Sequence, residues 1–285
     1  MRVGIAQIDG KWPNLALMKL SAWHKARGDD VTIANGLERY DILYASKVFA
    51  FTPDWDSYPI ADRIVRGGSG FDMTLELPEE VEHMMPDYGL FNVERAMGFT
   101  TRGCARKCQF CIVPVKEGRI RRHAPISEFW AGQREVCLMD NNLTAAPDVL
   151  AEDCAFIREH NLTVDFHQGL DARLITDAMA REIASVRHAG RIHFAWDSMA
   201  VEEPVLEGLR IMSQYVNSHK LTVYVLIGFD TTPEEDYYRV MKLHELGYES
   251  FVMPFNKSDT YQRRFTRWVN AKPAFKSVKW EDYKG

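Results

Sequence analysis

The pattern of hydrophobic and polar positions divides the chain into two parts. In the first part, apolar positions alternate over Arg2–Ile8, and Asn14–Arg27 has the apolar spacing of an amphipathic helix. Two short apolar runs, Val31–Ala34 and Ile42–Ala45, have the length and composition of strands. A helix placed among strands is typical of an α/β unit, so the pattern predicts a small α/β domain over residues 1–92.

From about residue 93, apolar runs alternate regularly with helical stretches. The predicted strands are Gly98–Arg102, Glu135–Asp140, Leu162–Gln168, Arg191–Asp197, Leu221–Gly228 and Ser250–Asn256. The predicted helices are Ser127–Gln133, Asp148–His160, Thr176–His188, Val201–His219 and Thr232–Leu246. The start of the last helix is marked by Thr232 as N-cap, by Pro233 in the first helical position and by Glu235 two residues later.

This alternation predicts the architecture of the second part. Strand–helix–strand units are right-handed and form a parallel sheet, and six strands are fewer than the eight of a closed barrel. The sequence therefore predicts an α/β fold with a partial (β/α)6 TIM-like barrel over residues 93–257. The small Rossmann-like α/β domain of residues 1–92 precedes the barrel, and a C-terminal helical extension, residues 258–285, follows it.

Two of the predicted strands have one polar face and one apolar face. The polar residues are Thr163, Asp165 and His167 in one strand and Arg191, His193 and Asp197 in the other. A packed barrel interior normally holds branched apolar residues, so a polar interior indicates a binding cavity. Further polar residues and a glycine lie at the predicted carboxyl ends of strands, namely Asp140, Gln168, Gly228, Asp230 and Asn256. We take Asp165, His167, His193 and Asn256 as candidates for substrate contact; for the two histidines, the alternative is a purely structural hydrogen bond.

The composition is that of an ordinary globular protein. The 285 residues carry a net charge of −5, with 46% hydrophobic and 26% charged residues, which excludes disordered, collagen-like and coiled-coil classes. The acidic balance argues against a broad basic surface for nucleic acid. No apolar run approaches the roughly 18 residues of a membrane span, and the first residues lack a signal-peptide pattern. We therefore expect a cytoplasmic protein without membrane contact.

Three of the five cysteines lie within one short segment, at Cys104, Cys108 and Cys111. Five cysteines are too few for a disulfide scaffold. Three thiolates on one loop can coordinate one metal centre, and a structural zinc ion would need a fourth ligand at close spacing. The other two cysteines, Cys137 and Cys154, lie in a predicted strand and a predicted helix. Three ligands with one vacant position favour a [4Fe-4S] cluster with one open iron over zinc or chance clustering.

The motif C-x-x-x-C-x-x-C after the first barrel strand, with an aromatic residue before its third cysteine, resembles the radical S-adenosylmethionine (SAM) superfamily over residues 96–256. The resemblance implies that SAM binds the open iron and that its cleavage gives a 5′-deoxyadenosyl radical, which abstracts hydrogen from a substrate. It also implies a flavodoxin- or ferredoxin-type reductant. An oxygen-sensitive cluster suits a reducing cytoplasm.

The resemblance also implies which residues contact SAM. Phe110 corresponds to the aromatic residue beside the adenine, and the Asp140-Asn141-Asn142 segment stands where the family often has Gly-Gly-Glu facing the SAM ammonium group. The remaining positions implied in SAM binding are Gln168, Arg173, Asp197, Ile227 and Gly228.

Two subgroups of the superfamily bear on the reaction. The segment Cys111–Gly118 resembles the methylthiotransferases, but those enzymes hold a second cluster on three N-terminal cysteines, and this chain has no cysteine before Cys104. Sulfur insertion is therefore not expected. Residues 1–92 resemble a shortened cobalamin domain, with Gly67-Gly68-Ser69-Gly70 at the position of its late glycines. The cobalt-ligating D-x-H-x-x-G motif is absent, so cobalamin is not expected and a structural turn is the preferred interpretation of the glycines.

The substrate is the least defined part of this interpretation. A basic stretch follows the cysteines, and a second one lies near the C-terminus with interleaved aromatic residues. The basic residues and the interleaved aromatics are Lys116, Arg119, Arg121, Arg122 and His123, and Arg263, Arg264, Phe265, Arg267 and Trp268. Such stretches bind phosphates and stack bases, or they form ordinary solvated faces. A nucleotide, nucleic-acid or peptide substrate is favoured, with a cobalamin-assisted radical methylase and a non-catalytic electron carrier as alternatives.

Overall fold

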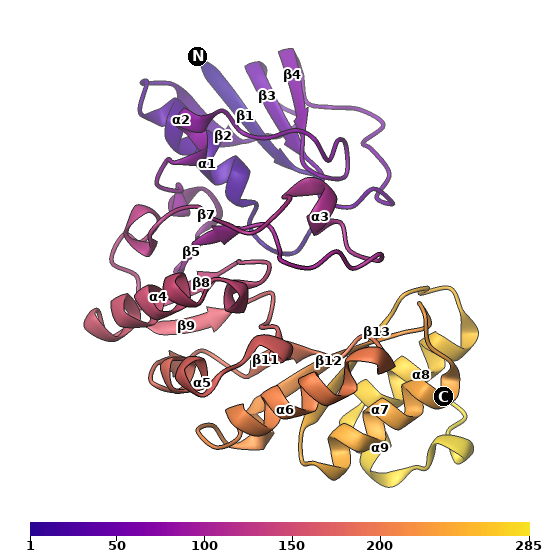
Figure 1. The fold of residues 1–285 in the computed structure, drawn as a ribbon. Coiled ribbons are helices and arrows are strands. Elements are labelled where there is room, and N and C mark those ends of the chain that lie inside the picture. The colour runs from indigo at the N-terminus through magenta and orange to yellow at the C-terminus, as the bar shows by residue number, and fades with distance from the viewer.

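The computed structural model describes all 285 residues and shows an α/β protein with parallel sheets. The N-terminal part, drawn in indigo and purple in Figure 1, contains one four-stranded sheet in the order β2-β1-β3-β4. Its strands and helices are β1 (Arg2–Gln7), α1 (Leu15–Lys25), β2 (Asp30–Ile33), β3 (Tyr40–Ser46), β4 (Ala61–Gly67) and α2 (Glu79–Glu82). All pairings in this sheet are parallel, so the small α/β unit predicted from periodicity is confirmed in its element order.

The second part contains two parallel sheets and a small antiparallel ribbon. One sheet has the order β10-β9-β8-β5 and the other the order β11-β12-β13. The strands are β5 (Ala96–Gly98), β6 (Thr101–Arg102), β7 (Arg121–Arg122), β8 (Glu135–Leu138), β9 (Thr163–Phe166), β10 (Arg187–His188), β11 (Ile192–Ala195), β12 (Leu221–Ile227) and β13 (Glu249–Pro254). A single parallel bridge, between Leu170 and Phe194, joins the two sheets. The sheets do not form a closed barrel, and the partial barrel stays a prediction.

Helices cover the apolar face of both sheets. They are α4 (Pro147–Glu159), α5 (Asp177–Ala184), α6 (Glu202–Met212), α7 (Pro233–Glu245), α8 (Thr260–Asn270) and α9 (Lys272–Ser277), whereas the short α3 (Val113–Lys116) lies between β6 and β7 and has no buried residue. The capping box predicted for α7 is present, because Thr232 and Glu235 each accept a backbone hydrogen bond from the other residue. Phe265 and Trp268 of α8 belong to the main hydrophobic core, so the C-terminal helices pack on the second sheet as part of one core.

The period-2 alternation predicted for the strands is confirmed. Val164 and Phe166 of β9 are buried in the main core, whereas Thr163 and Asp165 between them are only partly buried. On β8, Cys137 points to the opposite face from the main core and packs with Leu15 at the start of α1. The N-terminal unit therefore covers part of the face that the sequence assigns to the barrel interior.

The predicted helix Ser127–Gln133 is wrong. The structure has only one 3-10 turn there, Ile126–Glu128, and the chain then runs irregularly. Phe129 is buried against β5, and a Cβ atom on Gly98 of that strand would lie 2.4 Å from the Phe129 ring. This tertiary contact, together with Gly132 in the left-handed region, overrides the local helical pattern.

Several boundaries also differ from the prediction. The strand expected over Gly98–Arg102 is split into β5 and β6, since the chain turns at Thr100 and β6 pairs with β7 in the antiparallel ribbon. The end of the helix expected over Thr176–His188 forms β10 instead, and the helix expected over Val201–His219 ends at Met212. These ends depend on sheet pairing, which local periodicity does not encode.

Candidate functional site

The three clustered cysteines lie on one loop between β6 and β7. The loop begins at Gly103, which has a φ of +82° and whose Cβ, if it had one, would lie 2.3 Å from the carbonyl oxygen of Arg119. At the same place, the backbone N–H of Cys104 donates to the carbonyl of Gly118 over 3.2 Å. The ribbon thus closes the base of the loop, and only glycine fits at residue 103.

The sulfur atoms of this loop accept hydrogen bonds. The backbone N–H of Arg106 lies 3.3 Å from Cys104 Sγ, and that of Val113 lies 3.5 Å from Cys111 Sγ. The side-chain amide of Asn142 adds a donor to Cys104 Sγ at 3.4 Å. All three cysteines are free and half-buried. Since donors of this kind stabilise negative charge on sulfur, the loop suits thiolate ligands of a metal centre.

Burial raises the pKa of the Cys108 thiol, and the neighbouring Asp197, Cys111 and Cys104 raise it further, while the Arg173 guanidinium acts in the opposite direction. Arg173 and Asp197, two of the residues implied in SAM binding, therefore lie close enough to Cys108 to influence its charge.

Asp171 joins the cysteine loop to the strand ends. Its carboxylate accepts from Arg173 Nε at 2.6 Å and Nη2 at 2.8 Å, and from Arg106 Nε of the loop at 3.0 Å. Asn142 Nδ2 lies 3.5 Å from the same group. Although burial opposes ionisation, the Arg173 and Arg106 contacts keep the pKa of Asp171 below its ordinary value. Sequence reasoning missed Asp171, although its position between Gln168 and Arg173 in the HQGLDAR segment was a signal.

We expect Asp171→Asn to lower the free energy of unfolding by about 2 kcal/mol, since two arginines lose a charged acceptor in a partly buried place. The matched control is Asp177→Asn, which removes an exposed pair with Arg181 and should leave stability essentially unchanged. Urea unfolding of both variants measures the difference. Equal stabilities for the two variants would contradict the structural role of Asp171.

Asp140 serves as a buried anchor for the turn between β5 and β6. Its carboxylate accepts hydrogen bonds from the backbone N–H and the hydroxyl of both Thr100 and Thr101, and only 3% of the residue is exposed. The hydrogen-bonding capacity of the Asp140 carboxylate is therefore used by groups inside the protein. The contact with the SAM ammonium group implied for Asp140 stays a prediction that this packing does not support.

A second buried carboxyl, Asp153 of α4, shares the Thr100 hydroxyl with Asp140. Thr100 Oγ1 lies 2.6 Å from Asp153 Oδ2 and 3.0 Å from Asp140 Oδ1, but the hydroxyl has only one hydrogen. A protonated Asp153 resolves this conflict by donating to Thr100, which then donates to Asp140. Burial, with a further contribution from Asp140, raises the pKa of Asp153 to about 7.

This arrangement predicts a pH dependence of stability. Asp153 keeps its proton in the folded state up to about pH 7, whereas the unfolded chain releases it near pH 4. The folded state therefore binds the extra proton, and its stability falls as pH rises between these values by about 1 kcal/mol per pH unit. In Asp153→Asn this loss is absent, so the unfolding curves of variant and wild type should diverge from pH 4 to pH 7. Parallel curves would contradict the protonated state.

The other predicted SAM contacts are spread along the strand ends. Asp197 follows β11; its carboxylate accepts from the N–H of Leu226 at 3.3 Å, and burial raises its pKa. The preceding residue, Trp196, is held by a fully buried Arg239, which donates from Nη1 to the Trp196 carbonyl at 2.6 Å. Ile227 is fully buried. A side chain at Gly228, whose φ is +73°, would collide with Gln262 of α8.

The remaining predicted residues differ in exposure. Phe110 packs edge-on against Phe229 with ring centres 5.4 Å apart, so the cysteine loop reaches the loop after β12. Asn141 has a buried amide nitrogen without a hydrogen-bond partner. Gln168 and Asn256 are exposed, and Asn256 caps its own turn by accepting from Ser258 N–H. The structure thus brings Asn142, Arg173 and Asp197 toward the cysteines and leaves Gln168 and Asn256 at the surface.

The histidine candidates lie on the face covered by the N-terminal unit. His167 Nδ1 is 3.2 Å from Asp165 Oδ2, and the ring of Trp12 packs edge-on against the His167 ring at 4.4 Å. His193 stacks on Tyr224 with ring centres 5.1 Å apart. In a cobalamin domain, the loop after the first strand would carry the cobalt-ligating histidine. In this protein the loop after β1 carries Trp12, which packs against His167.

The glycine turn of residues 67–70 packs against the backbone after β3. A side chain at Gly68 would lie 2.4 Å from the carbonyl oxygen of Lys47, and the Gly70 N–H donates to that oxygen over 2.8 Å. This close approach explains the glycines as the structural turn that the sequence favoured.

A hollow of about 530 Å³ opens beside the cysteine loop. It is lined by Cys104, Ala105, Arg106, Lys107, Pro114, Gly118, Arg119 and Ile120. None of the predicted SAM contacts lines it, and three of its eight residues are cationic. This surface therefore suits an anionic molecule next to the cysteines.

Comparison with known proteins gives one distant similarity. The chain is 23% identical over 197 residues to a tRNA-2-methylthio-N(6)-dimethylallyladenosine synthase of Sulfurihydrogenibium sp. (strain YO3AOP1). The match covers 59% of this chain and 45% of that protein, so the chain spans less than half the length of its relative. No protein-family model matches the chain. None of the helices has the length and hydropathy needed to cross a membrane.

Proposed function

We propose that this protein is a radical SAM enzyme in which Cys104, Cys108 and Cys111 hold a [4Fe-4S] cluster. The observation that carries the proposal is the cysteine loop itself, which holds three free, half-buried thiols and places N–H donors on two of their sulfurs. A ligand set of three thiolates fits a cluster with one open iron, whereas structural zinc sites take four protein ligands. The distant similarity to a methylthio-forming synthase supports the same class of chemistry.

The proposed chemistry divides between the cofactors and the chain. When bound and reduced by one electron from a flavodoxin- or ferredoxin-type protein, a cluster held by Cys104, Cys108 and Cys111 would supply the electron for cleavage of SAM to methionine and a 5′-deoxyadenosyl radical, which would take a hydrogen atom from the substrate. The chain's own residues orient these partners. Asn142 donates to Cys104 Sγ, and Asp171 holds Arg173 through Nε and Nη2, which leaves the other N–H groups of the guanidinium to receive the carboxylate of SAM in this proposal.

The reaction of the relative is not transferred to this chain. Residues 1–103 contain no cysteine, so the N-terminal unit offers no thiolates for the second cluster typical of methylthiotransferases. Hydrogen abstraction without sulfur insertion is therefore the proposed reaction, and cobalamin is not part of the proposal.

We further propose that the substrate is anionic, with a nucleotide or nucleic acid favoured over a peptide. The hollow beside Cys104 presents Lys107 and Arg119, and the exposed Arg121 continues this basic surface on β7, where the neighbouring Arg122 pairs with Glu152. The C-terminal basic stretch does not add a stacking platform, because Phe265 and Trp268 are buried. Positive charge next to the cysteines positions phosphate groups near the site of radical formation.

Anaerobic reconstitution tests the cofactor part of this proposal. The chain should take up about four iron and four sulfide ions per molecule, as a three-thiolate cubane site requires. The reduced protein should give an electron paramagnetic resonance signal that shifts when SAM is added, because SAM occupies the open iron. A stable zinc or two-iron centre, or a four-iron signal insensitive to SAM, would contradict the proposal.

A further inference from the structure

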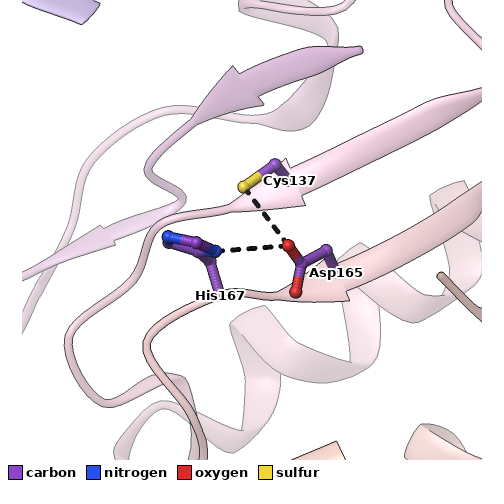
Figure 2. A group of neighbouring side chains, drawn as sticks. All are labelled: Cys137, Asp165 and His167. Carbon is purple, nitrogen blue, oxygen red and sulfur yellow. Dashed lines mark hydrogen bonds and ion pairs between the residues drawn. The ribbon is translucent and has the colours of Figure 1, made fainter. Parts of the chain in front are cut away.

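A second group of metal-binding side chains lies away from the cysteine loop, on neighbouring strands of the first sheet. Cys137 of β8 and Asp165 of β9 are directly paired residues in the parallel ladder, so their side chains emerge on the same face. His167 follows Asp165 by two residues and shares that face. Figure 2 shows the three side chains converging, with the Asp165 carboxylate between the thiol and the imidazole.

The distances between these groups are those of a small metal site. Cys137 Sγ lies 3.9 Å and His167 Nδ1 lies 3.2 Å from Asp165 Oδ2, and the three ligand atoms all lie within 4.8 Å of one another. With zinc–ligand bonds of about 2.0 to 2.3 Å, tetrahedral geometry separates neighbouring ligand atoms by about 3.3 to 3.6 Å. The two separations from Asp165 Oδ2 differ from these values by about 0.5 Å or less, and the Cys137–His167 separation exceeds them by at most about 1.5 Å.

We propose that Cys137, Asp165 and His167 bind one Zn²⁺ ion, with the fourth coordination position open to water or substrate. A thiolate, an imidazole and a carboxylate form a mixed set that zinc accepts, and three protein ligands with one open position are typical of catalytic rather than structural zinc. The proposal does not depend on the iron–sulfur cluster, since it uses none of the three loop cysteines.

The groups around the site are consistent with this assignment. His193 of β11 precedes Phe194, whose bridge to Leu170 joins the two sheets, and its Nδ1 is buried without a hydrogen-bond partner. A buried nitrogen of this kind normally takes a polar partner, and a metal-bound water is one. The nearest cation, Arg95, lies 3.7 Å from Asp165 Oδ2 but also pairs with Glu135 at 3.1 Å. Glu135 therefore balances the charge of Arg95, and the Asp165 carboxylate remains to balance the metal. Burial raises the pKa of the Cys137 thiol to about 12, so metal binding would displace the thiol proton.

Residues that touch the ligands reach solvent. Arg95, which lies 3.7 Å from Asp165 Oδ2, also lines a hollow of about 670 Å³. Trp12 packs on His167 and is 41% exposed. Two of the three ligands are therefore in contact with side chains that border solvent.

Cobalt(II) titration tests the site without interference from the cluster. The protein used is the full chain carrying Cys104→Ser, Cys108→Ser and Cys111→Ser, which removes the loop thiols. We expect one equivalent of Co²⁺ to give intense tetrahedral d–d bands and a thiolate-to-cobalt charge-transfer band, and one equivalent of Zn²⁺ to abolish them. No charge-transfer band in this protein would overturn the proposal, and it would leave the proposal for the loop cysteines untouched.

Further substitutions in the same background assign the ligands. Cys137→Ser should remove the charge-transfer band, while Cys154→Ser, at the other buried free thiol, should keep it. His167→Gln should weaken Zn²⁺ binding at least about tenfold, and His160→Gln, at the half-buried histidine that directly follows α4, should not. If Cys137→Ser fails to fold, as judged by circular dichroism, the comparison of His167→Gln with His160→Gln tests the assignment. A band that persists in a folded Cys137→Ser, or equal Zn²⁺ affinity for both histidine variants, would overturn the assignment.

Discussion

Cys108→Ser should abolish SAM cleavage while leaving the protein folded. A serine hydroxyl is not a thiolate at neutral pH, so the cluster would lose one of its three proposed protein ligands. The side chain of Cys108 is only half-buried and lies on a loop outside the hydrophobic core, so its replacement removes no core packing. We expect bound iron to fall to a small fraction of the wild-type value and 5′-deoxyadenosine formation to reach background. Iron analysis and chromatography of the reaction products measure both.

The matched control for this prediction is Cys154→Ser. Cys154 is fully buried in the main core, so the substitution should lower stability and yet keep the iron and the activity of the protein that remains folded. Full activity in Cys108→Ser, or equal loss of iron in both variants, would show that the ligands have been assigned wrongly.

Gly103→Ala should disrupt the cysteine loop, although it adds only one methyl group. The new Cβ would lie 2.3 Å from the Arg119 carbonyl oxygen, and the residue has a φ of +82° that alanine adopts only with strain. Backbone atoms on both sides must therefore move, at a cost of about 2 kcal/mol or more. Because Cys104 is the next residue, its sulfur moves with the backbone, and we expect SAM cleavage to fall at least about tenfold.

Gly118→Ala provides the control on the facing side of the same ribbon. Gly118 also has a positive φ, of +74°, but a side chain there would meet no atom within 4 Å. The variant should lose about 1 kcal/mol of stability from backbone strain alone and keep its iron and most of its activity. Similar losses of activity in both variants would mean that positive φ, rather than the collision with Arg119, controls the loop.

Local sequence patterns predicted the helices and strands whose ends are determined by residues next to those ends. Helix α7 was located by Thr232, Pro233 and Glu235, and all three act in the structure as the sequence indicates. The split of Gly98–Arg102 into two strands was not predictable in this way, because it depends on Asp140, which is 40 residues from Thr100 and ties down the turn. The short β10 strand likewise exists only because β9 pairs with it.

The same difference between local and tertiary determinants applies to the residues of the candidate site. The spacing of Cys104, Cys108 and Cys111 identified a shared loop, since ligands close in sequence need no tertiary information. The sequence places Cys137 in a strand but not beside Asp165, because that pairing follows from the register of two strands that the sequence does not fix. Asp171 was missed for a similar reason, since its importance comes from Arg106 on a distant loop.

The most direct test of the central proposal is the fate of SAM itself. The anaerobically reconstituted protein is incubated with SAM and dithionite, and the products are separated by chromatography. The proposal predicts 5′-deoxyadenosine and methionine in equal amounts, neither of which forms with Cys108→Ser. An intact, reduced four-iron cluster that leaves SAM unchanged would contradict it and would favour an electron carrier instead.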